Sequence, residues 1–186
     1  MLFRSGVPWV QLRDHQASDA DFADSARALV PRLRELEQPP LISINGRADL
    51  AAELGTGAHL PAWQAERMEA RPQLPGDALL GVSAHDEKEI DAALSIGADC
   101  LTFSPVFPTS SKPEADGVGT LALERAVERA GSVPVLALGG ITPDRVGPCL
   151  EAGAHGVAVL SGLMEADHPE AAARAYLEAL SRAVTT

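Results

Sequence analysis

Residues 94–103 read LSIGADCLTF, and this stretch decides the fold. It runs from the end of a predicted helix, through a glycine and a small residue, into a short apolar run. Similar stretches occur at 52–60 (AELGTGAHL) and at 150–160 (LEAGAHGVAVL). Glycine adopts the positive φ that terminates a helix more readily than other residues do. Each stretch therefore predicts a helix followed directly by a strand, and helix ends are expected at Gly55, Gly97, Gly131 and Gly153.

The same order of elements repeats about seven times along the chain. Short apolar runs, such as LLGVSA at 79–84 and VPVLAL at 133–138, alternate with helical patterns. Continuous apolar strands are typical of parallel sheets that are covered by helices. The alternation indicates an α/β fold, either a doubly wound sheet or a (β/α)8 barrel. Helices are predicted over 19–36, 47–55, 62–74, 87–97, 120–131, 142–153 and 169–183.

Two features favour the barrel. The units are short and uniform, and no GxGxxG motif follows the first strand. Polar residues and glycines also follow the strand ends, at Gln11, Arg13, Asn45, Ser83, His85, 109–112, Gly139, Gly140, Ser161 and Gly162. In a barrel these positions converge on the face where barrel enzymes place their active sites. Because a barrel needs eight strands, we predict a (β/α)8 TIM barrel that lacks the usual first strand–helix unit.

The missing unit would leave a parallel edge open, with unpaired backbone groups. We expect either a homodimer, in which a second copy covers the gap, or a natural chain start that lies upstream.

Composition limits the class of partner. The chain has 186 residues, a formal net charge of −11 and a pI near 4.8, which suit one domain over 1–186 and argue against nucleic acid or an anionic membrane. A small phosphate or pyrophosphate substrate remains compatible, because a few local donors suffice to bind it. The two cysteines have no zinc-binding spacing, and neither a signal peptide nor a membrane span is found, so we expect a cytoplasmic protein.

Two adjacent strand ends carry glycines, at Gly139-Gly140 and at Ser161-Gly162. Glycines allow backbone N–H groups to approach a ligand, and the loops after the last two strands of a barrel often bind phosphate. The alternative is that the glycines only form tight turns.

Gln11 and Arg13 lie two positions apart, so their side chains share one face of the first strand. A guanidinium inside a barrel needs an anionic partner, and Arg13 suits bidentate binding of a pyrophosphate. The alternative is an internal ion pair, for example with Asp14.

The stretch SPVFPTSSKP at 104–113 follows another predicted strand and places Thr109, Ser111 and Lys112 together. These donors suit an anion, and the prolines would preset the backbone of the loop. The alternative is a stiff polar loop without a ligand.

The histidines give weaker signals. His85 follows Ser83 at a strand end, but it also lies in the N-cap region of the next predicted helix. His59 is expected to be packed or half-exposed. No pair of carboxylates has metal-ligand spacing at the strand ends, so no metal site is predicted.

Taken together, these motifs resemble the thiamine-phosphate synthase and thiazole tautomerase superfamily. The resemblance covers nearly the whole chain, in GVPWVQLRD, GVSAH, GADCLTFSPVFPTSSKP, VPVLALGGI and EAGAHGVAVLSGL. It implies a (β/α)8 barrel and a role in thiamine biosynthesis. The synthase joins hydroxymethylpyrimidine pyrophosphate to a thiazole phosphate, and pyrophosphate leaves.

The resemblance also implies roles for individual residues. Arg13, Lys112 and Ser83 are expected to be catalytic. Gly139, Gly140, Ser161 and Gly162 are expected to bind the thiazole phosphate, and the expected contacts to the pyrimidine and pyrophosphate are Gln11, Asn45, Thr109 and Ser111.

Three departures from the family pattern leave alternatives open. Synthases bind Mg2+ through two aspartates, whereas this chain has Gly46 and Gln64 there. The tautomerase histidine falls at Pro105, and the lysine expected after the first strand is His15. The alternatives to a synthase are therefore a tautomerase-like isomerase and a catalytically degenerate binder of thiazole phosphate or thiamine phosphate.

Overall fold

The computed structural model describes residues 6–111 and 116–184, and a sheet of seven parallel strands organises them. The strands follow one another in chain order, so each pairs only with its neighbours in sequence. They are β1 (Trp9–Leu12), β2 (Leu41–Asn45), β3 (Gly57–Leu60), β4 (Leu80–Ala84), β5 (Cys100–Phe103), β6 (Val135–Leu138) and β7 (Gly156–Ala158). The predicted α/β class and parallel sheet are confirmed.

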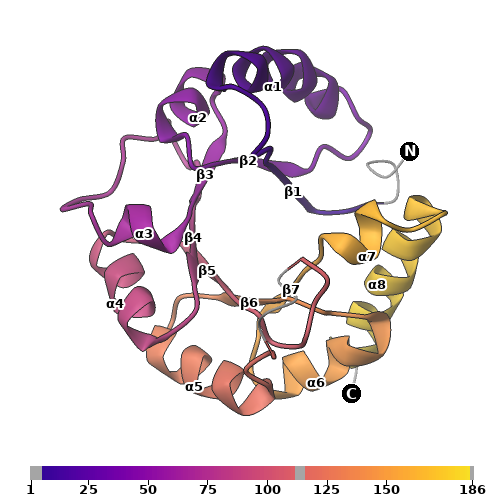
Figure 1. Cartoon of the computed structure of the whole chain (residues 1–186). Helices are drawn as coiled ribbons and strands as arrows, with labels where there is room; N and C mark the ends of the chain where they lie inside the picture. The colour runs from indigo at the N-terminus through magenta and orange to yellow at the C-terminus, as the bar shows by residue number, and fades with distance from the viewer. Residues whose placement is uncertain (1–5, 112–115, 185–186) are drawn as a thin grey trace.

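The helices surround the curved sheet as an outer ring (Figure 1). They are α1 (Asp19–Arg34), α2 (Ala48–Leu54), α3 (Ala62–Ala65), α4 (Glu87–Ser95), α5 (Thr120–Ala130), α6 (Val146–Glu151), α7 (Ser161–Met164) and α8 (Pro169–Val184), with a 3-10 turn η2 (Pro143–Arg145) before α6. Within the described residues β1 and β7 are the edges of the sheet and do not pair with each other. The eight-stranded closure predicted for a complete barrel is therefore not formed by this part of the chain. No helix in the described ranges is long and apolar enough to cross a membrane.

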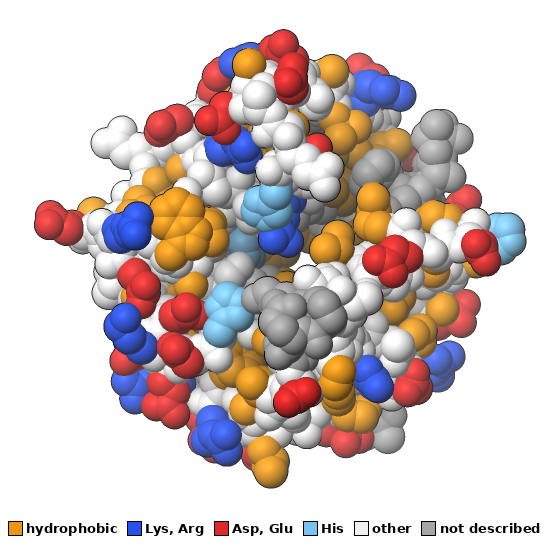
Figure 2. All heavy atoms as spheres, viewed as in Figure 1, with side chains coloured by type: hydrophobic (Ala, Val, Ile, Leu, Met, Phe, Trp, Pro, Cys, Tyr) orange, Lys and Arg blue, Asp and Glu red, His pale blue; other side chains and the backbone are white. Residues whose placement is uncertain are grey.

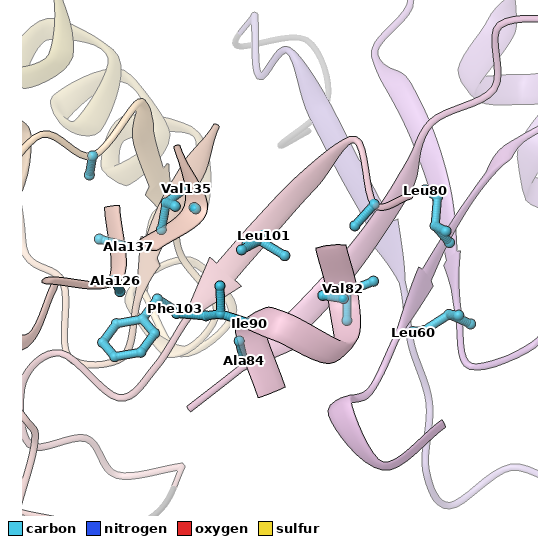
Figure 3. Packing of buried hydrophobic residues seen from close by; sticks show 14 of the residues in the cluster. Leu60, Leu80, Val82, Ala84, Ile90, Leu101, Phe103, Ala126, Val135 and Ala137 are labelled. Atoms are coloured by element: carbon cyan, nitrogen blue, oxygen red, sulfur yellow. The ribbon is translucent and has the colours of Figure 1, made fainter. Parts of the chain in front are cut away.

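One face of the sheet packs against the helices and forms the hydrophobic core. Val82 pairs in register with Leu101, and Leu101 pairs with Val135, so these side chains point the same way. All three are at most 2% exposed, and Ile90 of α4 packs against the same cluster (Figure 3). The outward positions of neighbouring strands therefore form one apolar layer beneath the helices.

The opposite face of the sheet carries polar side chains on β1 to β5, whereas Leu136 of β6 lies in register with Thr102. Gln11 is in register with Ser43, Asn45 with His59, and Ser83 with Thr102. Side chains alternate between the two faces of a strand, so these residues point into the ring, away from the helices. The sheet therefore encloses a polar interior.

Two predicted helices differ from the structure. The helix expected over 62–74 ends at Ala65, and Pro72 and Pro75 disfavour regular helix only toward the end of the predicted range. The helix expected over 142–153 is divided into η2 and α6. The helix-ending glycines are confirmed, since Gly55, Gly97, Gly131 and Gly153 all have positive φ.

The segment after β5 packs closely on the turn after β6. The N–H of Val106 donates to the carbonyl of Leu138 at 2.9 Å, and the N–H of Phe107 donates to that of Gly139 at 3.0 Å. Gly140 has a φ of +60°, and a Cβ there would collide with the carbonyl oxygen of Pro108. This turn therefore requires glycine both for its φ and for close approach.

A Gly140→Ala variant is expected to destabilise the protein by about 2–4 kcal/mol, because the strain of positive φ adds to overpacking. Gly97→Ala is the matched control, since Gly97 also has positive φ but a Cβ added there would meet nothing within 4 Å. It should cost about 1 kcal/mol. Urea denaturation measures both, and equal losses would contradict the packing argument.

Candidate active site

The carboxyl ends of β1 and β2 bring two amide side chains together. The Nε2 of Gln11 donates to the Oδ1 of Asn45 at 2.8 Å. Asn45 is buried, and Gln11 is exposed at the mouth of the polar interior. In the space-filling view, histidine side chains and a basic side chain gather around the hollow at the centre of the ring (Figure 2).

Arg13 follows β1 and remains available to an anion. Its Nε donates to the Nε2 of His15 at 2.6 Å, so the imidazole orients the guanidinium. The alternative ion pair with Asp14 does not form, since the Oδ1 of Asp14 accepts the N–H groups of Gln16 and Ala17 instead. No carboxylate pairs with Arg13 among the described residues.

His59 of β3 lies in the polar interior and is 3% exposed. Its Nε2 lies 3.1 Å from the Oγ of Ser83 and 3.2 Å from the Oγ1 of Thr102. Gly81 makes room for the ring, because a Cβ there would collide with the Nδ1 of His59. Burial lowers the pKa of His59 from 6.5 to about 4, with a smaller contribution from the positive charge of Arg13. The imidazole ring is therefore neutral at pH 7, and its Nε2 lies within hydrogen-bonding distance of both hydroxyl groups.

The sequence did not single out His59 or Thr102 for the interior. His59 is packed, as one of the two expectations had it, but its polar partners were not foreseen. Strand register is the signal that finds them, because His59 pairs with Asn45 and Thr102 pairs with Ser83.

His85 has a local partner on the helix that follows it. Its Nδ1 lies 2.7 Å from the Oε2 of Glu89, and the same oxygen accepts the N–H of His85 at 2.7 Å. Asp86 is the N-cap of α4 and accepts the N–H of Glu89. The pairing with the first turn of the helix favours the structural interpretation of His85.

Tyr176 of α8 contacts both glycine-containing turns. The hydroxyl of Tyr176 donates to the carbonyl of Ile141 at 2.9 Å and abuts Gly162. Ser161 and Gly162 form the start of the short α7. Gly139 and Gly140 lie close to the segment after β5, and Gly162 lies close to Tyr176. The requirement for glycine at both turns is therefore explained by close packing. Phosphate binding at these turns stays a prediction.

The loop at 104–111 leaves Thr109 half-buried and Ser111 exposed. The N–H of Ser111 lies 3.4 Å from the Oγ1 of Thr109. Lys112, the third member of the predicted anion cradle, lies outside the described residues.

A family model and relatives of similar sequence point to one family. The model of the thiamine monophosphate synthase family matches residues 1–163. The chain belongs to this family. It is 38% identical over 181 residues to the thiamine-phosphate synthase of Natronomonas pharaonis, a match that covers 95% of this chain and 83% of that protein.

Two further relatives extend the comparison. The chain is 40% identical over 141 residues to the thiamine-phosphate synthase of Bacillus velezensis, which covers 75% of this chain and 62% of that protein. The solved thiamine phosphate pyrophosphorylase from Pyrococcus furiosus is 25% identical and superposes with a TM-score of 0.81, covering 98% of this chain and 87% of that one.

The magnesium ion implied by the family resemblance does not fit the residues present. The two positions expected to hold aspartates contact each other, since the Nε2 of Gln64 donates to the carbonyl of Gly46 at 3.0 Å. Mg2+ is usually held by carboxylates together with other oxygen ligands, and neither a glycine nor a neutral glutamine supplies a carboxylate. Within the described ranges no group of three or more His, Cys, Asp or Glu could hold a metal ion.

The buried imidazole should make stability depend on pH. Below pH 6.5 the unfolded chain takes up a proton at His59 that the folded chain does not bind until about pH 4. The free energy of unfolding therefore falls by about 3 kcal/mol because of this group as the pH falls from 6.5 to about 4. Urea denaturation of a His59→Gln variant should show a shallower fall in unfolding free energy between pH 7 and pH 4 than the wild type does.

His155→Gln serves as the control, because His155 is exposed. It should retain the pH dependence of the wild type. If His59→Gln retains it as well, the assignment of a neutral buried imidazole is wrong.

Proposed function

We propose that this chain is a thiamine-phosphate synthase, which joins hydroxymethylpyrimidine pyrophosphate to thiazole phosphate. The observation that carries the proposal is the family match over residues 1–163. The polar interior supports it, because Gln11, Asn45 and Ser83 share the inward face of the sheet. We also propose that the seven-stranded sheet is a (β/α)8 barrel reduced by its first unit.

The reaction needs charge stabilisation more than proton transfer. The bond between the pyrimidine methylene carbon and the pyrophosphate oxygen breaks, and pyrophosphate departs with the electron pair. The thiazole nitrogen then donates its lone pair to that carbon, so no proton is gained or lost. Catalysis consists of stabilising the departing anion and aligning two rings.

The cation at the mouth suits the departing group. Arg13 presents a planar fork of N–H donors, which matches phosphate oxygens bidentately. Its Nε is held by His15, and no carboxylate among the described residues competes with the substrate for its charge. Thr109, Ser111 and the predicted Lys112 would supply further donors to the same anion.

The interior offers complementary groups for a pyrimidine. The amides of Gln11 and Asn45 provide both donors and acceptors, and their mutual hydrogen bond orients both side chains. Ser83 lies on the same inward face, within hydrogen-bonding distance of His59, which pairs with Asn45. On this proposal the thiazole phosphate occupies the turns of Gly139-Gly140 and Ser161-Gly162.

A second candidate is a binder of thiazole phosphate or thiamine phosphate that does not couple the substrates. The pairing of Gln64 with Gly46, where the resemblance implies magnesium ligands, is the observation that favours it. The synthase would form thiamine phosphate from the two substrates, and the binder would not.

Incubation of the protein with both substrates should yield thiamine phosphate, measured by chromatography after conversion to a fluorescent product. Arg13→Ala should lower kcat/KM by about 100-fold, because a preorganised donor to the leaving group is lost. The kcat/KM of Arg13→Lys should lie between those of the wild type and Arg13→Ala, since lysine keeps the positive charge but lacks the planar fork of donors.

Arg125→Ala is the control, because Arg125 is exposed on α5. It should leave the rate unchanged. Tight binding of thiazole phosphate in calorimetry without any coupled product would favour the binder and contradict the synthase.

A further inference from the structure

We propose that this chain binds the pyrophosphate group directly, without a bridging divalent cation. The inference rests on the proposed function for its substrate class, but it is carried by the geometry of the 46–47 turn. Gln64 closes the position that the family resemblance gives to magnesium, and Arg13 supplies the positive charge.

Both backbone polar groups of Gly46 are already engaged. Its N–H donates to the carbonyl of His59 at 2.8 Å, and its carbonyl accepts the Nε2 of Gln64 at 3.0 Å. The end of β2 is thereby tied to the end of β3 and to α3 by direct hydrogen bonds. A divalent cation that bridged these two segments would meet only neutral amide and carbonyl oxygens at positions 46 and 64, and no carboxylate.

The neighbouring carboxylates are directed elsewhere. Asp19 and Glu53 line the cavity beside Gly46 and Gln64, but each is paired with an arginine. Asp19 lies 2.9 Å from a guanidinium nitrogen of Arg47, and Glu53 lies 2.8 Å from the Nε of Arg27. Asp49 also lines this cavity, and a single carboxylate does not make a site for a hard dication.

The charge of the site explains why the loss of the cation is tolerable. Two aspartates and one Mg2+ carry no net charge together, and neither do a glycine and a glutamine. The replacement therefore leaves the net charge at the mouth unchanged, while Arg13 keeps a full positive charge without a carboxylate partner among the described residues. Arg13 directly follows the carboxyl end of β1, at the edge of the polar interior. An incoming anion meets this charge directly.

Titration calorimetry with inorganic pyrophosphate tests the inference on the wild-type protein. The Kd in EDTA should equal or fall below the Kd in excess MgCl2. Arg13→Ala should weaken binding at least tenfold in EDTA, and Arg125→Ala should not change it. A Kd at least tenfold weaker in EDTA than in MgCl2, or no binding in either condition, would overturn the proposal.

A double variant tests the closed position itself. Gly46→Asp with Gln64→Asp should create a saturable Mn2+ site, detected by loss of the free-ion signal in electron paramagnetic resonance. The matched control is Gly46→Asn with Gln64→Asn, which has the same shape without the charge; Asp and Asn both tolerate the φ of +69° at position 46 better than most residues. Neither the control nor the wild type should bind Mn2+ saturably, and a wild-type Mn2+ site that the control abolishes would overturn the proposal.

The coupling assay separates this inference from the proposed function. Pyrophosphate binding that is insensitive to EDTA, together with no thiamine phosphate formed, supports cation-free binding and contradicts the synthase. Product that forms only with magnesium present contradicts cation-free binding and supports the synthase.

Discussion

The structure depends on the in-register pairing of parallel strands with alternating side chains. Pairing in one register places Val82, Leu101 and their neighbours against the helices, and a shift by one residue would exchange the two faces of a strand. The apolar face secures the register, because its burial supplies the main stabilising free energy. The same register fixes which polar residues are neighbours on the inward face. The packing of the core therefore determines how the amides, hydroxyls and imidazole of the interior are aligned.

The polar interior tolerates a buried imidazole because hydroxyl groups satisfy it. His59 is neutral, and Ser83 and Thr102 lie within hydrogen-bonding distance of its ring. The positive charge near this site is concentrated on Arg13, at the mouth, where water and an anionic ligand can both reach it. A neutral interior below a cationic mouth suits a substrate with an uncharged ring and an anionic tail.

The sequence predicted the parallel strands well, because glycine-terminated helices and apolar runs are local signals. The predicted helix over 62–74 was wrong beyond Ala65, and part of the reason was visible in the sequence, since Pro72 falls inside the predicted range. The absence of an ion pair between Arg13 and Asp14 could not be read from the sequence, since the turn that engages Asp14 depends on backbone geometry. The inward orientation of His59 was not predicted, because Ala58 and Leu60 flank it in an apolar run. Only the pairing with neighbouring strands shows which face of β3 it lies on.

The strand order of the sheet has a consequence for how the chain folds. Every strand pairs with the strand before or after it in sequence, and no described pairing joins distant parts of the chain. Each pairing therefore closes only the stretch of chain between two successive strands, and the entropy lost in closing a loop grows slowly with its length. The sheet can therefore grow by addition of one strand–helix unit at a time from any pair that forms first, and losing a unit at one end leaves the remaining pairings intact.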